Sequence, residues 1–157
     1  MKTPRRRRLE AKTDYKARLA LLKSGRPRLV VRKSNRYIIA QIVESDIAQD
    51  KVIAGANSKV LLSRGWPKEM AGSLKSLSAA YLTGFILGKI AQEKKVKEAI
   101  LDMGMYRTVK GSRIYAVLKG AVDAGIKIPH NAEMLPSEEK IKNEKTEKIL
   151  NKIMGGK

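Results

Sequence analysis

Four consecutive arginines, Arg5 to Arg8, form the densest group of charged side chains in this 157-residue chain. A guanidinium group stays charged at physiological pH and presents a forked set of donors, so it binds phosphate through paired, charge-assisted hydrogen bonds. A run of such groups can follow a sugar-phosphate backbone. A solvated tail or a localisation signal would have the same sequence, but the segments that follow are also basic, which favours phosphate binding.

A second cluster, Arg32 to Tyr37, combines three cations with a hydroxyl, an amide and an aromatic ring. Proteins that recognise irregular RNA use such mixtures to hold phosphates, 2′-hydroxyls and unstacked bases. The alternative is structural, in that Asn35 only makes a turn and Tyr37 packs sideways. We expect the binding role.

Groups that could support catalysis are scarce. The single histidine, His130, lies at a chain reversal, where a structural hydrogen bond is expected. Asp102 and Asp123 could form a paired-carboxylate site, but each lies near a glycine at the end of a buried element, which favours capping or turn formation. The Gly84–Gly88 segment lacks the lysine and the spacing of a phosphate-binding loop. We expect no catalytic residue and no cofactor.

The absence of cysteine excludes disulfides, thiolate zinc sites and cysteine nucleophiles. A single histidine also argues against a histidine-rich metal centre, so no metal is expected.

Positive charge dominates the composition, with 34 Lys and Arg against 15 Asp and Glu and a formal net charge of +19. Residues 1–36 hold fourteen of these cations and only two acids, Glu10 and Asp14. A chain this basic repels itself unless a polyanion neutralises it, and nucleic acid is the commonest such partner. The N-terminal quarter is therefore the expected binding region.

Membrane attachment is not expected. The longest uncharged run, Ser76 to Gly88, is too short to span a bilayer and fits a buried helix better. No apolar segment follows the basic Met1 to Arg8 stretch, so the chain shows no secretory signal. We expect a cytoplasmic protein.

The elements that must position these cations begin with the arm. Residues 1–12 should form a flexible basic arm that orders only on a partner, because four adjacent arginines repel one another. Thr13 can cap a short helix that ends near Ser24, with Gly25 as its stop.

Three extended runs follow: Arg28–Arg32, Tyr37–Val43 and Val52–Ala56. The three-residue connection Ser34–Arg36 and the polar turn Glu44–Asp50 join them into an antiparallel meander.

Alternation along these strands separates two faces. One face is apolar and should be core: Leu29, Val31, Ile38, Ala40 and Ile42. The other face mixes cations with an aromatic ring and an amide, and carries Arg28, Val30, Arg32, Tyr37, Ile39 and Gln41.

Two helices and one strand complete the predicted domain, residues 13–135. A helix over Met70–Gln92 has small residues at Ala80, Gly84 and Gly88 that would let it lie close to the sheet. A buried strand at Ala99–Asp102 precedes a helix over Ser112–Ala124, which Ser112 caps and Gly125 stops.

The order β-β-β-α-β-α predicts an α/β fold with a mixed sheet of about four strands, covered by helices, in which a crossover adds one strand in parallel. Residues 136–157 should form a charged C-terminal helical extension with a stripe of Ile141, Ile149, Leu150 and Ile153.

Six segments occur in a familiar order: Thr13–Tyr15, Leu21–Gly25, Pro27–Asn35, Ser78–Gly84, Gly120–Gly125 and Ile128–Asn131. Together they resemble the large-subunit ribosomal protein of the L-eighteen family, in its archaeal form, over roughly residues 5 to 135. The resemblance implies a protein of α/β fold with no enzymatic activity. Such a protein is part of the 50S subunit, binds 5S rRNA and helps to seat it in the central protuberance. The resemblance also implies contact with the large-subunit (23S-type) rRNA and a neighbouring protein of the L-five family.

The resemblance assigns RNA contact to the arm, the first helix and the first hairpin, and strand alternation adds Gln41. The expected RNA-binding residues are Arg5, Arg6, Arg7, Arg8, Lys12, Tyr15, Arg18, Lys23, Arg26, Arg28, Arg32, Lys33, Ser34, Asn35, Arg36, Tyr37 and Gln41.

Two alternatives remain open at this point. A DNA-compacting protein or generic RNA binder would use the same charge without recognising shape. An RNA-modifying enzyme would use Asp102 or Asp123 as a base and would need a cofactor pocket that the sequence does not display.

Overall fold

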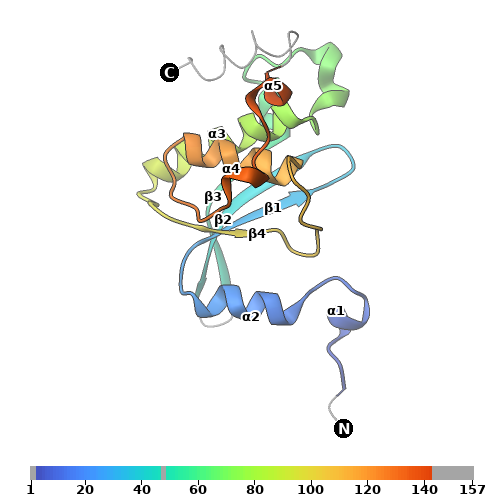
Figure 1. The fold of residues 1–157 in the computed structure, drawn as a ribbon, viewed down its shortest axis with the longest axis vertical. Coiled ribbons are helices and arrows are strands. Elements are labelled where there is room, and N and C mark those ends of the chain that lie inside the picture. Colours follow the sequence, from blue (N-terminus) through green and yellow to red (C-terminus); the bar gives the residue numbers. More distant parts are fainter. Residues whose placement is uncertain (1–2, 47–48, 143–157) are drawn as a thin grey trace.

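The computed structural model describes residues 3–46 and 49–142 (Figure 1). Its α-helices are α1 (Arg6–Leu9), α2 (Tyr15–Lys23), α3 (Leu77–Glu93), α4 (Arg113–Asp123) and α5 (Glu138–Ile141). Its strands are β1 (Arg28–Lys33), β2 (Ile38–Asp46), β3 (Gln49–Asn57) and β4 (Ile100–Asp102). Short 3-10 helices cover Ser58–Leu62, Lys68–Ser73 and Ala132–Met134.

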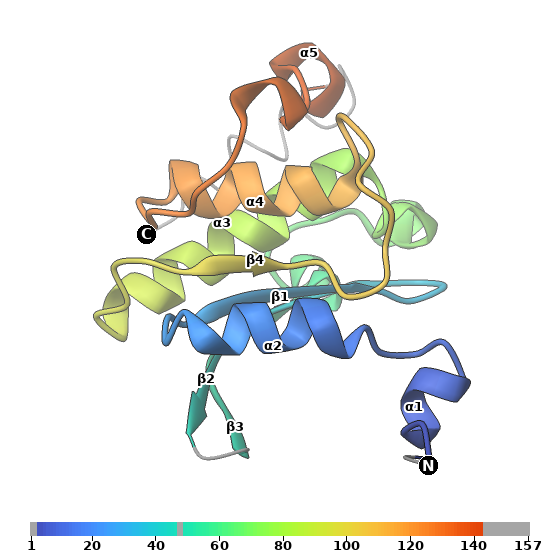
Figure 2. The same ribbon diagram turned by 60° about the horizontal axis from the view of Figure 1, so that its bottom comes forward.

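The four strands form one mixed sheet in the order β3-β2-β1-β4. The strand pairs β1–β2 and β2–β3 are antiparallel, and β4 joins β1 in parallel after the α3 crossover. Helices α3 and α4 cover one face, whereas α2 lies beside β1 and β4 on the side away from α4 (Figure 2). The predicted fold class, strand order and parallel crossover are confirmed.

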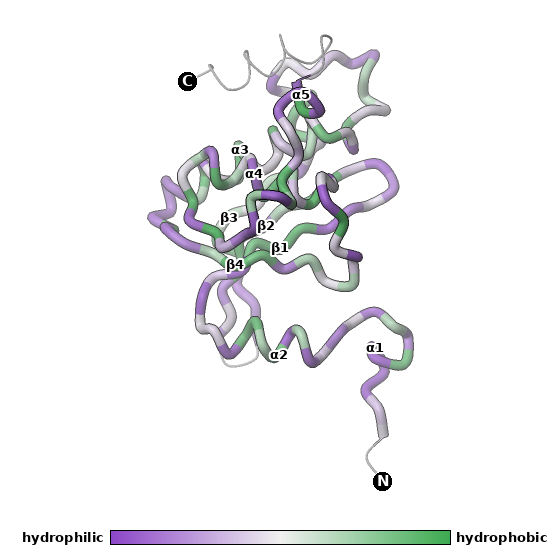
Figure 3. The backbone as a smooth tube through the Cα atoms, in the orientation of Figure 1, coloured by the Kyte–Doolittle hydropathy of each residue, from purple (hydrophilic) through white to green (hydrophobic). Residues whose placement is uncertain are grey.

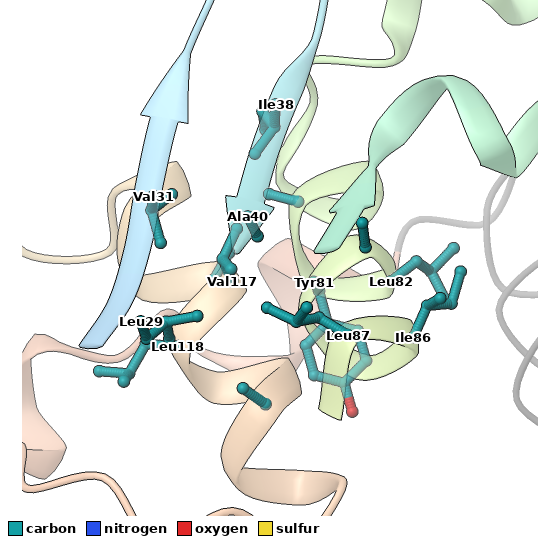
Figure 4. Packing of buried hydrophobic residues seen from close by; sticks show 14 of the residues in the cluster. Leu29, Val31, Ile38, Ala40, Tyr81, Leu82, Ile86, Leu87, Val117 and Leu118 are labelled. Carbon is teal, nitrogen blue, oxygen red and sulfur yellow. The ribbon is translucent and has the colours of Figure 1, made fainter. Parts of the chain in front are cut away.

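Strand alternation predicted the core face correctly. Leu29 lies opposite Ile42, Val31 lies opposite Ala40, and these four side chains are fully buried together with Ile38. They pack against apolar side chains of α3 and α4 (Figure 4): Tyr81, Leu82, Ile86, Leu87, Val117 and Leu118.

The small residues of α3 have a different role from the one predicted. A Cβ added at Gly84 would lie 2.1 Å from the Val117 carbonyl oxygen, and one at Gly88 would lie 2.4 Å from the Ala124 Cβ. From the other helix, a Cβ at Gly120 would lie 2.1 Å from the Tyr81 carbonyl oxygen. Helix α3 does pack on the sheet, but Gly84 and Gly88 face α4, so the predicted partner of these two glycines was wrong.

Helix α3 begins seven residues later than predicted. The Ser76 hydroxyl caps it by accepting a hydrogen bond from the Ala79 N–H, at 3.2 Å. Upstream, the Met70 carbonyl accepts from the Trp66 indole and the Ser73 hydroxyl, and Met70 itself has non-helical backbone angles. The buried Trp66 therefore holds this segment in a 3-10 turn that periodicity alone could not reveal.

The meander also differs in its details. Strand β2 continues to Asp46 and strand β3 already begins at Gln49, and Glu44 pairs with Lys51. Most of the predicted Glu44–Asp50 turn is therefore strand. These residues form a ribbon that extends beyond the helical layer (Figures 1 and 2), where neither face needs to be apolar.

Two helix caps need correction. The carboxylate of Asp14, and not Thr13, caps α2 by accepting from the Lys16 and Ala17 N–H groups. Ser112 occupies the N-cap position of α4 as predicted, but its hydroxyl makes no capping bond. Gly25 and Gly125 have positive φ angles and end their helices as predicted.

The two ends of the domain are partly described. The arm contains one helical turn, α1, with no buried residue, and its predicted flexibility stays a prediction. At the other end Ile141 is buried, and its carbonyl accepts from the Ser78 hydroxyl. The rest of the predicted C-terminal stripe, Ile149, Leu150 and Ile153, lies outside the described residues.

Substituting Gly84 with alanine should lower the free energy of unfolding by about 2 kcal/mol, because the new methyl group must push α3 away from the α4 backbone. Alanine has the higher helix propensity, so an uncrowded site would instead gain up to about 1 kcal/mol. Chemical denaturation followed by circular dichroism measures the change. Gly72→Ala is the control, since a Cβ there meets nothing within 4 Å. A stabilised Gly84→Ala variant would contradict the packing described.

Candidate nucleic-acid interface

The basic N-terminal segments gather at one end of the molecule. Helix α2 and strand β1 run side by side in opposite directions, so the arm before α2 and the hairpin tip after β1 emerge at the same end (Figures 1 and 2). The arm and the tip are mostly hydrophilic, whereas the hydrophobic stretches lie in the sheet and the covering helices (Figure 3).

Two contacts join the arm to the start of α2 and to the residue that precedes its cap. The Arg5 guanidinium lies 4.8 Å from the centre of the Tyr15 ring, and the Arg7 Nε donates to the Thr13 hydroxyl at 2.9 Å. Both arginines remain exposed, so these contacts orient the arm without removing its charge from solvent.

Five side chains of alternating charge connect α2 with three strands. Arg18 of α2 contacts Asp50 of β3 at 3.0 Å, and Asp50 contacts Arg28 of β1 at 2.8 Å. Arg28 contacts Asp102 of β4 at 3.0 Å, and Asp102 contacts Arg32 of β1 at 2.9 Å. We call this set the charge chain.

Arg28 differs from the other arginines because it is only 2% exposed. Its guanidinium donates to Asp102, to Asp50 and to the Ser45 hydroxyl, which lies 2.8 Å away. Alternation had placed Arg28 on the cationic face, and the family resemblance had placed it among the RNA contacts. In the structure Arg28 is enclosed by the β2–β3 ribbon and β4, and its donors are committed to internal acceptors, so it does not lie on an open face; its RNA contact stays a prediction.

Asp50 keeps its charge in the charge chain. Partial burial raises the pKa of its carboxyl, but hydrogen bonds from Ser45, Arg18 and Arg28 outweigh this and lower the pKa to about 2. Asp50 is therefore ionised at neutral pH and continues to pair with both arginines.

The hairpin tip is closed by Ser34. Its hydroxyl accepts from the Tyr37 N–H at 2.8 Å and donates to the Tyr37 carbonyl at 3.0 Å. Lys75, which lies just before the cap of α3, donates to the Asn35 carbonyl. The Asn35 and Arg36 side chains are exposed, so the tip presents an amide and a guanidinium to solvent.

Tyr106 is a positioning residue that the sequence interpretation missed. Its hydroxyl accepts from the Lys33 N–H at 3.1 Å and donates to the Lys33 carbonyl at 2.8 Å. The Lys33 ammonium lies 4.5 Å from the ring centre. Strand β4 pairs with only the first half of β1, Arg28–Val30. At the other end of β1, the Tyr106 hydroxyl takes the place of a partner strand by bonding to the backbone of Lys33.

The segment after Tyr106 carries three more exposed cations, Arg107, Lys110 and Arg113. Their three-residue spacing is a sequence signal that could have extended the candidate interface beyond residue 41.

The predicted contact residues fall into three groups by exposure. Arg28 is buried, and Tyr15, Arg18, Arg32, Lys33, Tyr37 and Gln41 are half-buried. The remaining side chains are exposed: Arg5, Arg6, Arg7, Arg8, Lys12, Lys23, Arg26, Ser34, Asn35 and Arg36.

The carboxylates and the histidine considered for catalysis have structural partners. Asp102 accepts from Arg28 and Arg32, and Asp123 accepts from the Tyr81 hydroxyl at 2.9 Å. Burial, and then the nearby Asp123, raises the pKa of Tyr81. His130 Nδ1 lies 2.7 Å from the Ile128 carbonyl oxygen.

Within residues 3–46 and 49–142, no group of three or more His, Cys, Asp or Glu side chains could hold a metal ion. None of the helices in those ranges has the length and hydrophobicity needed to cross a bilayer.

The mixed sheet and its cationic end define a basic α/β protein. A family described as "Ribosomal large subunit proteins 60S L5, and 50S L18" matches residues 1–97 and 88–131. The chain belongs to this family of large-subunit ribosomal proteins, as the resemblance implied. The family consists of structural ribosomal proteins, so the RNA-modifying enzyme is excluded.

Archaeal relatives named large ribosomal subunit protein uL18 support the assignment. The relative from Aeropyrum pernix is 49% identical over 91% of this chain and 65% of its own length. The relative from Korarchaeum cryptofilum is 51% identical over 94% of this chain and 74% of its own length. The relative from Methanothermobacter thermautotrophicus is 43% identical over 88% of this chain and 70% of its own length. The chain thus spans less than two thirds of the first relative and about three quarters of the second.

Replacing Arg28 with methionine should lower the free energy of unfolding by about 3 kcal/mol, since a buried carboxylate loses its partner. This loss of stability is at the low end of the range of about 3 to 5 kcal/mol for breaking a buried ion pair, because Arg32 still pairs with Asp102. Urea unfolding measures it. In the control Arg26→Met, the arginine side chain is 51% exposed and its Nε lies 3.9 Å from Glu98, so a change below about 0.5 kcal/mol is expected. Similar losses in the two variants would refute the structural role of Arg28.

Proposed function

We propose that this chain binds 5S rRNA and anchors it to the large-subunit, 23S-type rRNA in the central protuberance of the subunit. The observation that carries the proposal is family membership combined with the cationic end formed by the arm, α2 and the hairpin tip. A structural protein of the large subunit needs an RNA-binding surface, and this end supplies it.

The proposed mechanism begins with electrostatic capture. The exposed arginines of the arm neutralise phosphates and release counterions, which gives affinity without sequence preference. The hairpin tip then supplies groups that recognise riboses or unstacked bases: Asn35, Arg36 and Tyr37, with Gln41 on the strand behind them. Arg28 contributes by holding the strands that carry these groups.

The proposal divides the chain into a binding arm at residues 1–12, an α/β domain at 13–135 and a C-terminal extension at 136–157. It places the protein in the cytoplasm, within the 50S subunit. It also gives the chain a neighbour of the L-five family that shares the 5S rRNA.

A DNA-compacting or generic RNA-binding protein is the alternative that uses the same charge. Such a protein would bind duplex DNA as well as folded RNA, because phosphate contacts carry no shape information. The proposed function requires a preference for one folded RNA.

A titration against 5S rRNA, size-matched random RNA and duplex DNA at physiological salt tests the proposed function. We expect clear preference for 5S rRNA, because nonspecific affinity is weak at that salt, with a Kd of about 10⁻⁴ to 10⁻⁶ M. Equal affinity for all three would support the generic polyanion binder instead.

The salt dependence of 5S rRNA binding measures how many phosphates the arm neutralises. If about eight phosphates are neutralised, log affinity should fall with log salt at a slope of about −6 to −7. Replacing Arg5–Arg8 with alanine should make the slope shallower by about 3 and weaken binding to every RNA alike.

A matched control replaces four exposed lysines near the far end of α3, namely Lys94, Lys95, Lys97 and Lys127, and should leave the slope nearly unchanged. A wild-type slope shallower than about −2 would rule out electrostatic capture.

A further inference from the structure

A cleft of about 940 Å³ separates the arm and α2 from β4 and the segment that follows it. No residue of α2 is buried, so the helix does not close this space by apolar packing. Within the described part of the chain, Arg18–Asp50 is the only side-chain hydrogen bond or ion pair between α2 and the sheet. The helix thus forms one wall of an open cleft.

Four cations line the cleft: Arg7, Lys12, Arg18 and Arg32. Two carboxylates, Asp14 and Asp102, also line the cleft, and both are already hydrogen-bonded. Asp14 accepts from the first N–H groups of α2, and Asp102 accepts from Arg28, Arg32 and the Gly104 N–H. Lys12 and Arg18 are paired with Glu10 and Asp50, which lie outside the lining. The lining therefore carries a surplus of positive charge.

The same cleft has an apolar part. Leu21 of α2 lies on one wall, and Leu101, Met103 and Met105 lie on the other. Met105 is 53% exposed, which is high for a large apolar side chain. Flexible thioether side chains adapt to flat ring systems and make favourable contacts with them.

We propose that this cleft receives an unstacked nucleotide of RNA, with its base against the apolar wall and its phosphate at the cationic rim. The cleft lies in the usual size range of small-ligand sites, about 300 to 1,000 Å³, which suits an extruded nucleotide and not a base-paired helix. The lining has more cations than carboxylates, and its carboxylates are already hydrogen-bonded, so the cleft favours a polyanionic ligand over a peptide. The inference rests on the proposed RNA-binding function and adds a specific receptor for one base.

A bulky substitution on α2 tests the cleft without changing charge. Ala20 lines the cleft and is exposed, so Ala20→Trp should fill the space while leaving the helix intact. We expect affinity for 5S rRNA to fall about tenfold, the value of one lost stacking contact, with a salt slope shallower by no more than about 1, the value of one phosphate contact. The matched control is Leu19→Trp, because Leu19 is 54% exposed on α2 and does not line the cleft. It should bind like wild type, and equal affinities of the two variants would overturn the proposal.

Binding to a random-sequence single-stranded RNA tests the cleft proposal independently of the proposed 5S rRNA function. If wild type shows no preference for 5S rRNA but Ala20→Trp still weakens single-strand binding, the cleft stands and the proposed function fails. If wild type prefers 5S rRNA and Ala20→Trp binds both RNAs like Leu19→Trp, the proposed function stands and the cleft fails.

Cross-linking of the unmodified chain gives a second, independent test. In a complex with 4-thiouridine-substituted 5S rRNA, cross-linked peptides should include residues 101–106 or 17–21. Cross-links confined to the arm and the hairpin tip would overturn the proposal.

Discussion

The buried guanidinium of Arg28 is the constraint on which the cationic end of the molecule depends. A charge removed from water must be paired and fully hydrogen-bonded, and Arg28 finds its acceptors on three separate strands. Satisfying it fixes the β2–β3 ribbon and β4 relative to β1. Through Asp50 and Asp102 the same charge chain then positions Arg18 and Arg32, which line the cleft.

The remaining architecture lets one small domain carry a large positive charge. The apolar sheet face packs on α3 and α4, whose close approach depends on Gly84, Gly88 and Gly120. That packing does not involve the cations, so the arm and the hairpin tip remain in solvent. Helix α2 belongs to the cationic end more than to the core, because it has no fully buried residue and, among the described residues, one side-chain ion pair links it to the sheet.

Much of the fold could be predicted because local patterns and the core agree. Alternation identified Leu29, Val31, Ile38, Ala40 and Ile42 as core, and every one is fully buried. Alternation failed for Arg28 because it assigns a face and not an exposure, and the opposite face is covered near Asp50 and Asp102. The start of α3 was wrong because the buried Trp66 indole, four residues before Met70, controls the local turn.

The sequence by itself determined most of the element types, the apolar face of the sheet, the concentration of charge in residues 1–36 and the family to which the chain belongs. These depend on composition, short periodicities and ordered motifs. Only the tertiary structure decided that Arg28 is internal, that Tyr106 supports the hairpin and that a cleft lies beside α2. Each depends on residues far apart in the chain, such as Arg28 and Asp102, whose contact exists only because the α3 crossover returns β4 to the edge of β1.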